Sequence, residues 1–378
     1  ALKKLGDAFA QSVWAGLADL QLLESSQSSS NEQTYKAFAS PRRLAVWIKD
    51  VKAQAADKPL EQKLMPVSVG LTPDGQATPA LLKKLHALGV DTTDAESVVK
   101  QLQRLSDGKA EVLYYNSMAK GASLQQGLQS AIEHALVKLP IPKVMQYQLH
   151  QQCEMPGWST VSFVRPAHGL IALHGNQLVP VTVLGLSAGN STHGHRFEAN
   201  QHPVHITHAD AYEETMSSQG AVIASFDARS AAMVRALREQ AQQLGCRLEV
   251  EAAGLTDKQA EEALRHNELV QEVTALVERP TVMVCQFEEE FLQVPMECLT
   301  LTMKANQKYF PLLKSDGQLS HRFLIVSNIN PDNPAAVIGG NERVVRPRLA
   351  DAKFFFDQDR KKSLESRVAG LDKVIYHN

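Results

Sequence analysis

The character of the sequence changes three times along the chain, and these changes limit its possible folds more than any other feature. The chain becomes strand-rich near Phe163, residues 207–275 are helical in character, and strand-like runs return after Pro280. Apolar residues alternate in half-buried strands but follow the helical repeat in amphipathic helices, so the two kinds of segment predict different elements. We therefore expect an α+β fold in several pieces, with mixed or antiparallel sheets and a helical insertion at residues 207–275.

The individual elements are expected from periodicity and from turn residues. Helices are expected over residues 1–23, 78–88, 124–136, 209–220, 227–244 and 261–277, with Asp227 as an N-cap and Thr256-Asp-Lys-Gln259 as a capping box. Strands are expected over residues 44–51, 64–69, 109–115, 170–174, 178–184, 281–287 and 321–328. A polar loop is expected at residues 25–33 and a hairpin turn at His174-Gly-Asn-Gln177.

The length of 378 residues exceeds that of an average domain. We therefore divide the chain into an N-terminal α+β region at residues 1–150, a β-rich region at 151–335 that contains the helical insertion, and a basic and aromatic connector at 336–378.

The totals argue against several classes of protein. The formal net charge is −2, so a nucleic-acid role needs a local basic patch. The four cysteines lie far apart without Cys-x-x-Cys spacing, which argues against a thiolate zinc site and against a disulfide framework. No apolar run approaches the roughly 20 residues of a membrane span, and no signal segment opens the chain. We expect a cytoplasmic protein with no role at a membrane.

A basic and aromatic run at residues 339–362 is the strongest functional signal. It contains three consecutive phenylalanines, Phe354, Phe355 and Phe356, and the following basic residues: Arg343, Arg346, Arg348, Lys353, Arg360, Lys361 and Lys362. Arginine forks bind phosphate with two hydrogen bonds, so the run points to a polyanion such as RNA. For each candidate contact, and most strongly for Arg346, the competing interpretation is an intramolecular pair with Asp351, Glu342 or a helix C-terminus. The phenylalanines are expected in the core, since three consecutive rings are costly to expose.

A second basic and aromatic group lies in Thr302-Met-Lys-Ala-Asn-Gln-Lys-Tyr-Phe310. On a helix, Lys304 and Lys308 share one face at i,i+4 spacing and can follow two phosphates. Solvated lysines beside core aromatics are the competing interpretation.

Five histidines fall between residues 193 and 208, and they raise the question of a metal site. No cysteine is near, and the local carboxylates are only Glu198 and Asp210. A His-rich polar loop is therefore the preferred interpretation, and no metal ligand is assigned. In Gly194-His-Arg-Phe197, His195 and Arg196 are expected to form a structural turn or an anion-binding turn.

No catalytic motif is recognisable: the sequence lacks a P-loop, a Gly-x-Gly-x-x-Gly fingerprint and a Gly-x-Ser-x-Gly elbow. The acidic Glu288-Glu-Glu290 triplet is expected at a solvated hairpin tip. We assign no catalytic residue, and a metal-dependent hydrolase built on the histidines is the least favoured function.

A series of motifs resembles a known family. In order, these motifs are Ser40-Pro-Arg-Arg-Leu44, Lys138-Leu-Pro-Ile-Pro-Lys143, Phe163-Val-Arg-Pro166, Gly194-His-Arg-Phe197, Thr302-Met-Lys304, Gln307-Lys-Tyr-Phe-Pro311, Asn341-Glu-Arg-Val-Val-Arg-Pro-Arg-Leu-Ala-Asp-Ala352 and Phe354-Phe-Phe356. The series is similar to the β subunit of bacterial glycyl–tRNA synthetase of the two-subunit type, over nearly the whole chain. The sequence departs from the family pattern at His193, where the family often has arginine, and His202, His205 and His208 belong to no family motif.

The resemblance implies that this chain is the N-terminal half of such a subunit. Family members have a short strand and an acidic segment before the position of Ala1. They continue beyond Asn378 into an HD-type helical domain and an anticodon-binding region. Part of the chain is also expected to resemble the B3/B4 module of the phenylalanyl–tRNA synthetase β subunit.

The resemblance also implies a division of labour in an α2β2 enzyme. The α subunit holds the class II active site and uses ATP and magnesium, so no cofactor is expected in this chain. This half is expected to bind and position tRNA-Gly, and alone it is expected to be inactive. The candidate tRNA contacts are Arg343, Arg346 and Arg348, followed by Lys304 and Lys308. The alternative is an assembly scaffold that contacts the α subunit while the other half holds the tRNA.

Overall fold

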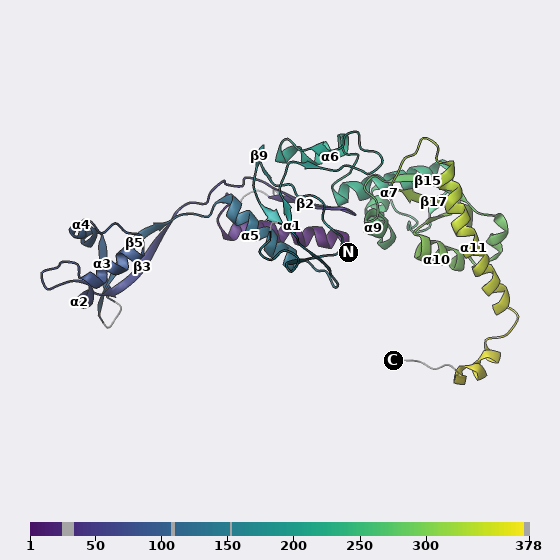
Figure 1. The fold of residues 1–378 in the computed structure, drawn as a ribbon. Helices are drawn as coiled ribbons and strands as arrows, with labels where there is room; N and C mark the ends of the chain where they lie inside the picture. The colour runs from purple at the N-terminus through teal and green to yellow at the C-terminus, as the bar shows by residue number, and fades with distance from the viewer. Residues whose placement is uncertain (25–33, 107–109, 152, 374–378) are drawn as a thin grey trace. The chain divides into compact units, whose positions relative to one another are not determined.

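Every named strand pairs with its neighbours in an antiparallel sense. Helices cover the larger sheets (Figure 1). The computed structural model describes residues 1–24, 34–106, 110–151 and 153–373. The prediction of an α+β fold in several pieces is confirmed. The loop expected at residues 25–33 lies outside the described residues.

The chain divides into two compact units, and the boundaries fall within two helices, α1 (Leu2–Asp19) and α5 (Leu124–Val137). One unit comprises Ala15–Ser30 and Asp50–Ala131, and the other comprises Ala1–Trp14, Asn31–Lys49 and Ile132–Asn378. Both helices were expected from the sequence. The predicted domain boundaries at residues 150 and 335 stay predictions, as does the resemblance to the B3/B4 module.

The smaller unit is built on a three-stranded sheet of order β3-β5-β4. Its elements are β3 (Lys58–Pro66), α2 (Val67–Gly70), α3 (Pro79–Ala87), α4 (Ala95–Lys100), β4 (Leu102–Ser106) and β5 (Glu111–Ala119). Leu64, Leu81 and Leu113 form its core. The strand expected over residues 64–69 ends early, because Pro66 is the N-cap of α2, and it starts earlier than expected at Lys58. Thr78 caps α3 through its side chain, which fits the helix expected there.

The larger unit contains a series of short antiparallel pairs. They are β1 (Tyr35–Ser40) with β2 (Arg43–Ile48), β6 (Met145–Gln148) with β7 (Thr160–Phe163), β8 (Leu173–His174) with β9 (Gln177–Leu178), β10 (Thr182–Val183) with β11 (Leu186–Ser187), and β12 (Ser191–Thr192) with β13 (Val204–His205). The hairpin turn expected at residues 174–177 is confirmed, and its Gly175 takes the positive φ of +61° that favours glycine. The long strand expected over 178–184 is instead divided between β9 and β10.

The largest sheet of this unit has the order β14-β16-β17-β15 and lies between two layers of helices. Its strands are β14 (Arg247–Leu248), β15 (Thr281–Gln286), β16 (Phe310–Leu313) and β17 (Leu319–Ser327). Successive side chains of a strand face opposite ways. Along β17, Leu324 therefore packs in the hydrophobic core on one face of the sheet, whereas Phe323 and Ile325 pack in the core on the other face.

The expected helical insertion supplies one of the two layers. Here α7 (Phe226–Gln243) and α9 (Glu268–Thr274) pack on the sheet through Met233, Leu237 and Val270. Because β14 lies within residues 207–275 and pairs in this sheet, these residues belong to the same layered unit as the strands after Pro280. The helix expected over 209–220 consists of a 3₁₀ turn, Ala209–Ala211, and α6 (Tyr212–Ser218).

The second layer consists of α10 (Met296–Gln307) and α11 (Ala335–Asp359). Met303 of α10 and Val345 and Leu349 of α11 are fully buried against this face of the sheet. The C-terminal half of α11 continues past α10 in Figure 1, and a 3₁₀ segment, Glu365–Lys373, follows it. In the described part of the chain, no helix combines the length and the apolar character that crossing a membrane requires.

Two helix boundaries were predicted wrongly. Residues 261–277 form two helices, α8 (Asp257–His266) and α9, because Asn267 between them is extended and its side chain accepts hydrogen bonds from Leu269 and Val270. The N-cap of α7 is Ser225 rather than Asp227. The capping box of Thr256 and Gln259 is confirmed.

Candidate nucleic-acid interface

The arginines of the basic run lie on α11, which is anchored to the sheet by one face. Val345 and Leu349 are buried, and Arg343, Arg346 and Arg348 are exposed. Pro347 lies inside the helix on the exposed side. The spacing of the two buried residues sets the rotation of the helix, and that rotation presents the arginines to solvent.

The three arginines differ in their partners. Arg346 forms an internal ion pair, as in the competing interpretation, but its partner is Glu288 at 2.5 Å rather than Asp351 or Glu342. The pKa of Glu288 lies below its usual value, first because the backbone N–H of Glu288 donates to its own carboxylate and then because of the contacts with Arg346. Within the described residues Arg343 and Arg348 form no ion pair, so their charges remain available.

The acidic triplet is not a hairpin tip. Glu288 precedes a 3₁₀ turn, Glu289–Gln293, that leads to α10, and β15 pairs with β17 instead of with the next segment. The segment after Glu288 is a helical turn rather than a strand, so no hairpin forms. Glu288 is also not simply solvated, because it accepts a hydrogen bond from Arg346 of α11.

Lys304 and Lys308 do not share a helix face as expected. Lys304 is in the last turn of α10, whereas Lys308 is its C-cap in the left-handed conformation, with φ at 60°. Each lysine has its own carboxylate: Lys304 pairs with Glu249 at 2.8 Å and Lys308 with Glu272 at 2.9 Å. A phosphate would have to compete with these two partners, so both lysines are weaker candidates than Arg343 and Arg348.

The phenylalanine triplet is not a core element as a whole. Phe356 packs against the core beneath α11, but Phe354 is 57% exposed and Phe355 is 64% exposed. The reason is the helical repeat: consecutive residues are about 100° apart on a helix, so three in a row cannot all face one core. The structure therefore places two rings on the same helix as the exposed arginines.

Two of the motifs, at residues 40–44 and 194–197, are joined through Arg43, which also reaches a buried carboxylate. Glu278 is 2% exposed and accepts hydrogen bonds from Arg43 and from Ser40, the latter at 2.7 Å. Arg43 also donates to the backbone carbonyls of His193 and Gly194. A Cβ on Gly194 would lie 2.7 Å from the backbone of Gly220, so only glycine fits this close approach. The cluster ties the 40–43 turn to the 194–197 turn.

His195 and Arg196 face different environments in the second turn. His195 is 1% exposed, its backbone N–H donates to Gly220, and its Nδ1 accepts from the N–H of Phe197. Arg196 is exposed, with its guanidinium over the ring of Phe197 at 5.8 Å. This geometry fits a structural turn at His195, and an anion contact by Arg196 stays a prediction.

Arg229 is a buried charge that was not anticipated from the sequence. Its side chain is fully buried, and it donates to the carbonyls of Ala39 at 2.7 Å, Ile223 at 2.7 Å and Thr274 at 3.2 Å. Burial lowers its pKa to about 10, opposed by the charge of Glu278. The alanine-rich pattern of α7 predicted a helix but contained no sign that one of its arginines points inward.

The histidine cluster is dispersed over turns and a short strand. His205 belongs to β13, and His208 accepts a hydrogen bond from the backbone of Asp210. In the described ranges, no group of three or more histidine, cysteine, aspartate or glutamate side chains is placed to hold a metal ion.

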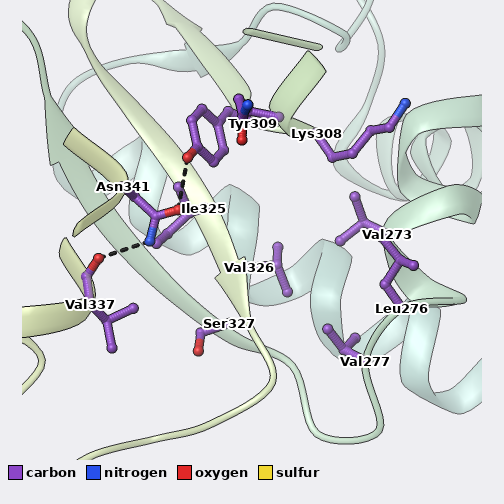
Figure 2. A pocket seen from close by; sticks show the side chains of 11 residues that line it. Val273, Leu276, Val277, Lys308, Tyr309, Ile325, Val326, Ser327, Val337 and Asn341 are labelled. Carbon is purple, nitrogen blue, oxygen red and sulfur yellow. Dashed lines mark hydrogen bonds between the residues drawn. The ribbon is translucent and has the colours of Figure 1, made fainter. Parts of the chain in front are cut away.

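One hollow of about 190 Å³ opens between α9, β17 and the start of α11 (Figure 2). Its lining is mixed, with apolar walls from Val273, Val326 and Val337 and polar groups from Gln307, Ser327 and Asn341. Figure 2 shows Tyr309 donating to Asn341, which in turn donates to the carbonyl of Val337. Its one lysine, Lys308, is paired with Glu272, so the hollow offers no free charge to a ligand.

Comparison with known proteins gives a consistent result. A family model described as "Glycyl-tRNA synthetase beta subunit" matches residues 1–378. Proteins named "Glycine--tRNA ligase beta subunit" are 59% identical over 378 residues in Polaromonas naphthalenivorans, 58% over 379 residues in Paracidovorax citrulli and 59% over 378 residues in Dechloromonas aromatica. Each match covers 100% of this chain and 50% of the relative, so the chain spans about half the length of the relatives.

Proposed function

Because the chain belongs to the glycyl-tRNA synthetase β-subunit family, we propose that it is a non-catalytic part of glycine–tRNA ligase that helps to bind and position tRNA-Gly. The observation that carries this proposal is the presence of Arg343 and Arg348 on the exposed face of α11, without an ion pair in the described residues. Unpaired guanidinium groups on a rigid helix suit phosphate contacts, which fix the position of a nucleic acid without reading its sequence.

The reaction itself belongs, in this proposal, to a separate α subunit. That subunit binds ATP, magnesium and glycine and forms the ester with tRNA, and the two kinds of chain assemble as α2β2 in the cytoplasm. This chain contributes positioning, because a tRNA that is held in the correct orientation reacts within a complex rather than through a random collision. No residue of this chain is assigned a chemical step.

An assembly scaffold is the second candidate, and one observation favours it. Large apolar side chains remain exposed in and after α11: Val344, Phe354, Phe355, Leu364, Val368 and Leu371. Exposed apolar patches often mark protein contacts. In this alternative the segment meets the α subunit, and the other half of the β subunit holds the tRNA.

Salt dependence separates the two candidates. We expect binding of tRNA-Gly to the full-length β subunit to weaken as salt rises, and the double variant Arg343→Gln/Arg348→Gln to reduce the slope of log K against log salt by about 0.7–0.9 per lost phosphate contact. The matched control is Arg235→Gln on α7, which lies outside the proposed surface. An unchanged slope in the double variant, with weakened binding to the α subunit, would support the scaffold instead.

A further inference from the structure

The exposed aromatic pair of α11 is not explained by phosphate contacts. Phe354 and Phe355 meet edge to face, with ring centroids 5.6 Å apart and planes inclined by 71°. Both rings are more than half exposed, at 57% and 64%. Two adjacent exposed rings on a helix whose opposite face packs on the sheet are a binding feature rather than a core feature.

The rings are in line with the free arginines. Phe354 follows Arg343 by 11 residues, so that the two differ by only about 20° around the helix and by about 16 Å along it. Phe355 follows Arg348 by seven residues, which again gives an offset of about 20° and a distance of about 10 Å. Each arginine therefore shares a stripe of the outer face with one ring, and the two stripes lie about 100–140° apart around the helix.

The charge around the rings is positive. Residues 343–362 contain seven basic and three acidic residues, in a chain whose net charge is −2. Two of the acids are already engaged, because Asp357 pairs with Lys353 and Asp359 with Arg367, both at 3.0 Å. Among the described residues of α11, the acids without an ion pair are Asp351 and Glu342, and Glu342 accepts a hydrogen bond from the backbone of Gln286. This balance complements a polyanion.

We propose that the outer face of α11 binds unpaired nucleotides of the tRNA, with phosphates on Arg343 and Arg348 and bases stacked on Phe354 and Phe355. Stacking on aromatic rings beside a basic track is how proteins hold single-stranded nucleic acid, and every base can stack because each has a π face. Protein interfaces, by contrast, are depleted in lysine, which is frequent here at residues 353, 361 and 362. The inference rests on the proposed function and adds the structural class of the nucleotides.

The test uses the full-length β subunit with its α subunit, and tRNA-Gly as the probe. Phe354→Leu/Phe355→Leu keeps the apolar character and removes the π faces, whereas Phe354→Trp/Phe355→Trp keeps both. We expect the leucine pair to raise the Kd for tRNA by roughly 5-fold or more for each ring that stacks, and the tryptophan pair to bind as well as the wild type. Competition by a 12-nucleotide single-stranded RNA against tRNA-Gly should be lost in the leucine pair, while competition by a double-stranded RNA should be unchanged.

The control is Trp158→Leu, an 82% exposed ring outside α11, which we expect to leave tRNA binding unchanged. The aromatic variants should keep the salt slope of the wild type, because stacking releases no counterions, whereas the arginine variants should flatten it. Wild-type tRNA binding by the leucine pair, together with a flattened slope in the arginine variants, would overturn the stacking inference and leave the proposed function standing. Weakened binding of the α subunit with unchanged binding of tRNA would overturn it in favour of a protein contact, and an unchanged slope in the arginine variants would overturn the proposed function itself.

Discussion

At the scale of single residues, the most consequential groups are the buried charges around Glu278. Arg43 reaches this carboxylate from the turn after β1, and Arg229 lies near enough for the charge of Glu278 to raise its pKa against the effect of burial. A buried charge is costly without its partner, so these residues fix the relative positions of segments that are far apart in sequence.

We expect Glu278→Ala to reduce the free energy of local unfolding by about 3–5 kcal/mol, because it leaves Arg43 without its buried partner. Hydrogen–deuterium exchange of β1, β2 and residues 193–200 measures this change. The control is Glu262→Ala, which removes an exposed pair with Arg265 and should cost about 0.5 kcal/mol or less. Equal effects of the two variants would contradict a role for the buried cluster.

The cysteines offer a second test at this scale. Burial, followed by the charge of Glu342, raises the pKa of Cys285 to about 12, whereas Cys298 is exposed. Because the thiolate is the reactive form, alkylation of the isolated subunit at pH 8 should modify Cys298 and spare Cys285 until the protein unfolds. Peptide mass spectrometry reports both sites, with Cys298→Ser to identify the fast one. Equally fast modification of Cys285 would show that its surroundings are open.

At the scale of elements, the helices with clear amphipathic patterns could be predicted and their interruptions could not. The apolar repeat of residues 1–23 gave α1, and the Thr256 capping box gave the start of α8. The break at Asn267 was missed because its side chain competes for backbone N–H groups inside an unbroken helical pattern. In α11 the basic run was noticed, but the exposure of Phe354 depends on which side Val345 and Leu349 bury, and that is decided by the sheet beneath them.

We expect Asn267→Ala to destabilise α9 by about 1 kcal/mol, because two backbone N–H groups at its start lose their acceptor. Asn267→Asp keeps an acceptor and should be nearly neutral. Exchange rates of the α9 amides give the comparison. If the α9 amides exchange as slowly in the alanine variant as in the aspartate variant, the cap does not define the start of this helix.

At the scale of the whole molecule, the sequence predicted the α+β class, and the family relationship followed from ordered motifs. It did not predict the layered sheet, since β14 has only two residues, Arg247 and Leu248, and pairs with a strand more than 60 residues later. Such a strand has no periodicity of its own and depends on long-range pairing. The same limit applies to the candidate interface: its arginines were predicted, but their different ion-pair partners, Glu288 for Arg346 and none described for Arg343, depend on tertiary structure.

Alkaline pH should destabilise the larger unit. Burial raises the pKa of Tyr309 and of Tyr212 from 10.0 to about 12. The unfolded chain releases these protons from about pH 10, whereas the folded chain keeps them until about pH 12, so the stability they contribute is complete below pH 10 and is lost between pH 10 and 12. Absorbance of ionised tyrosine at alkaline pH, recorded with circular dichroism, should show these two residues titrating together with unfolding. Their titration near pH 10 in a folded protein would contradict the burial.

The most direct test of the central claim is the steady-state rate of glycylation by the α and β subunits together, with Arg343→Gln/Arg348→Gln in the β subunit. If this half positions the tRNA, KM for tRNA-Gly should rise, by about 10-fold or more when two phosphate contacts are lost, while KM for ATP and for glycine stays the same. A wild-type KM for tRNA-Gly in the double variant would contradict the account and place the tRNA contacts elsewhere in the enzyme.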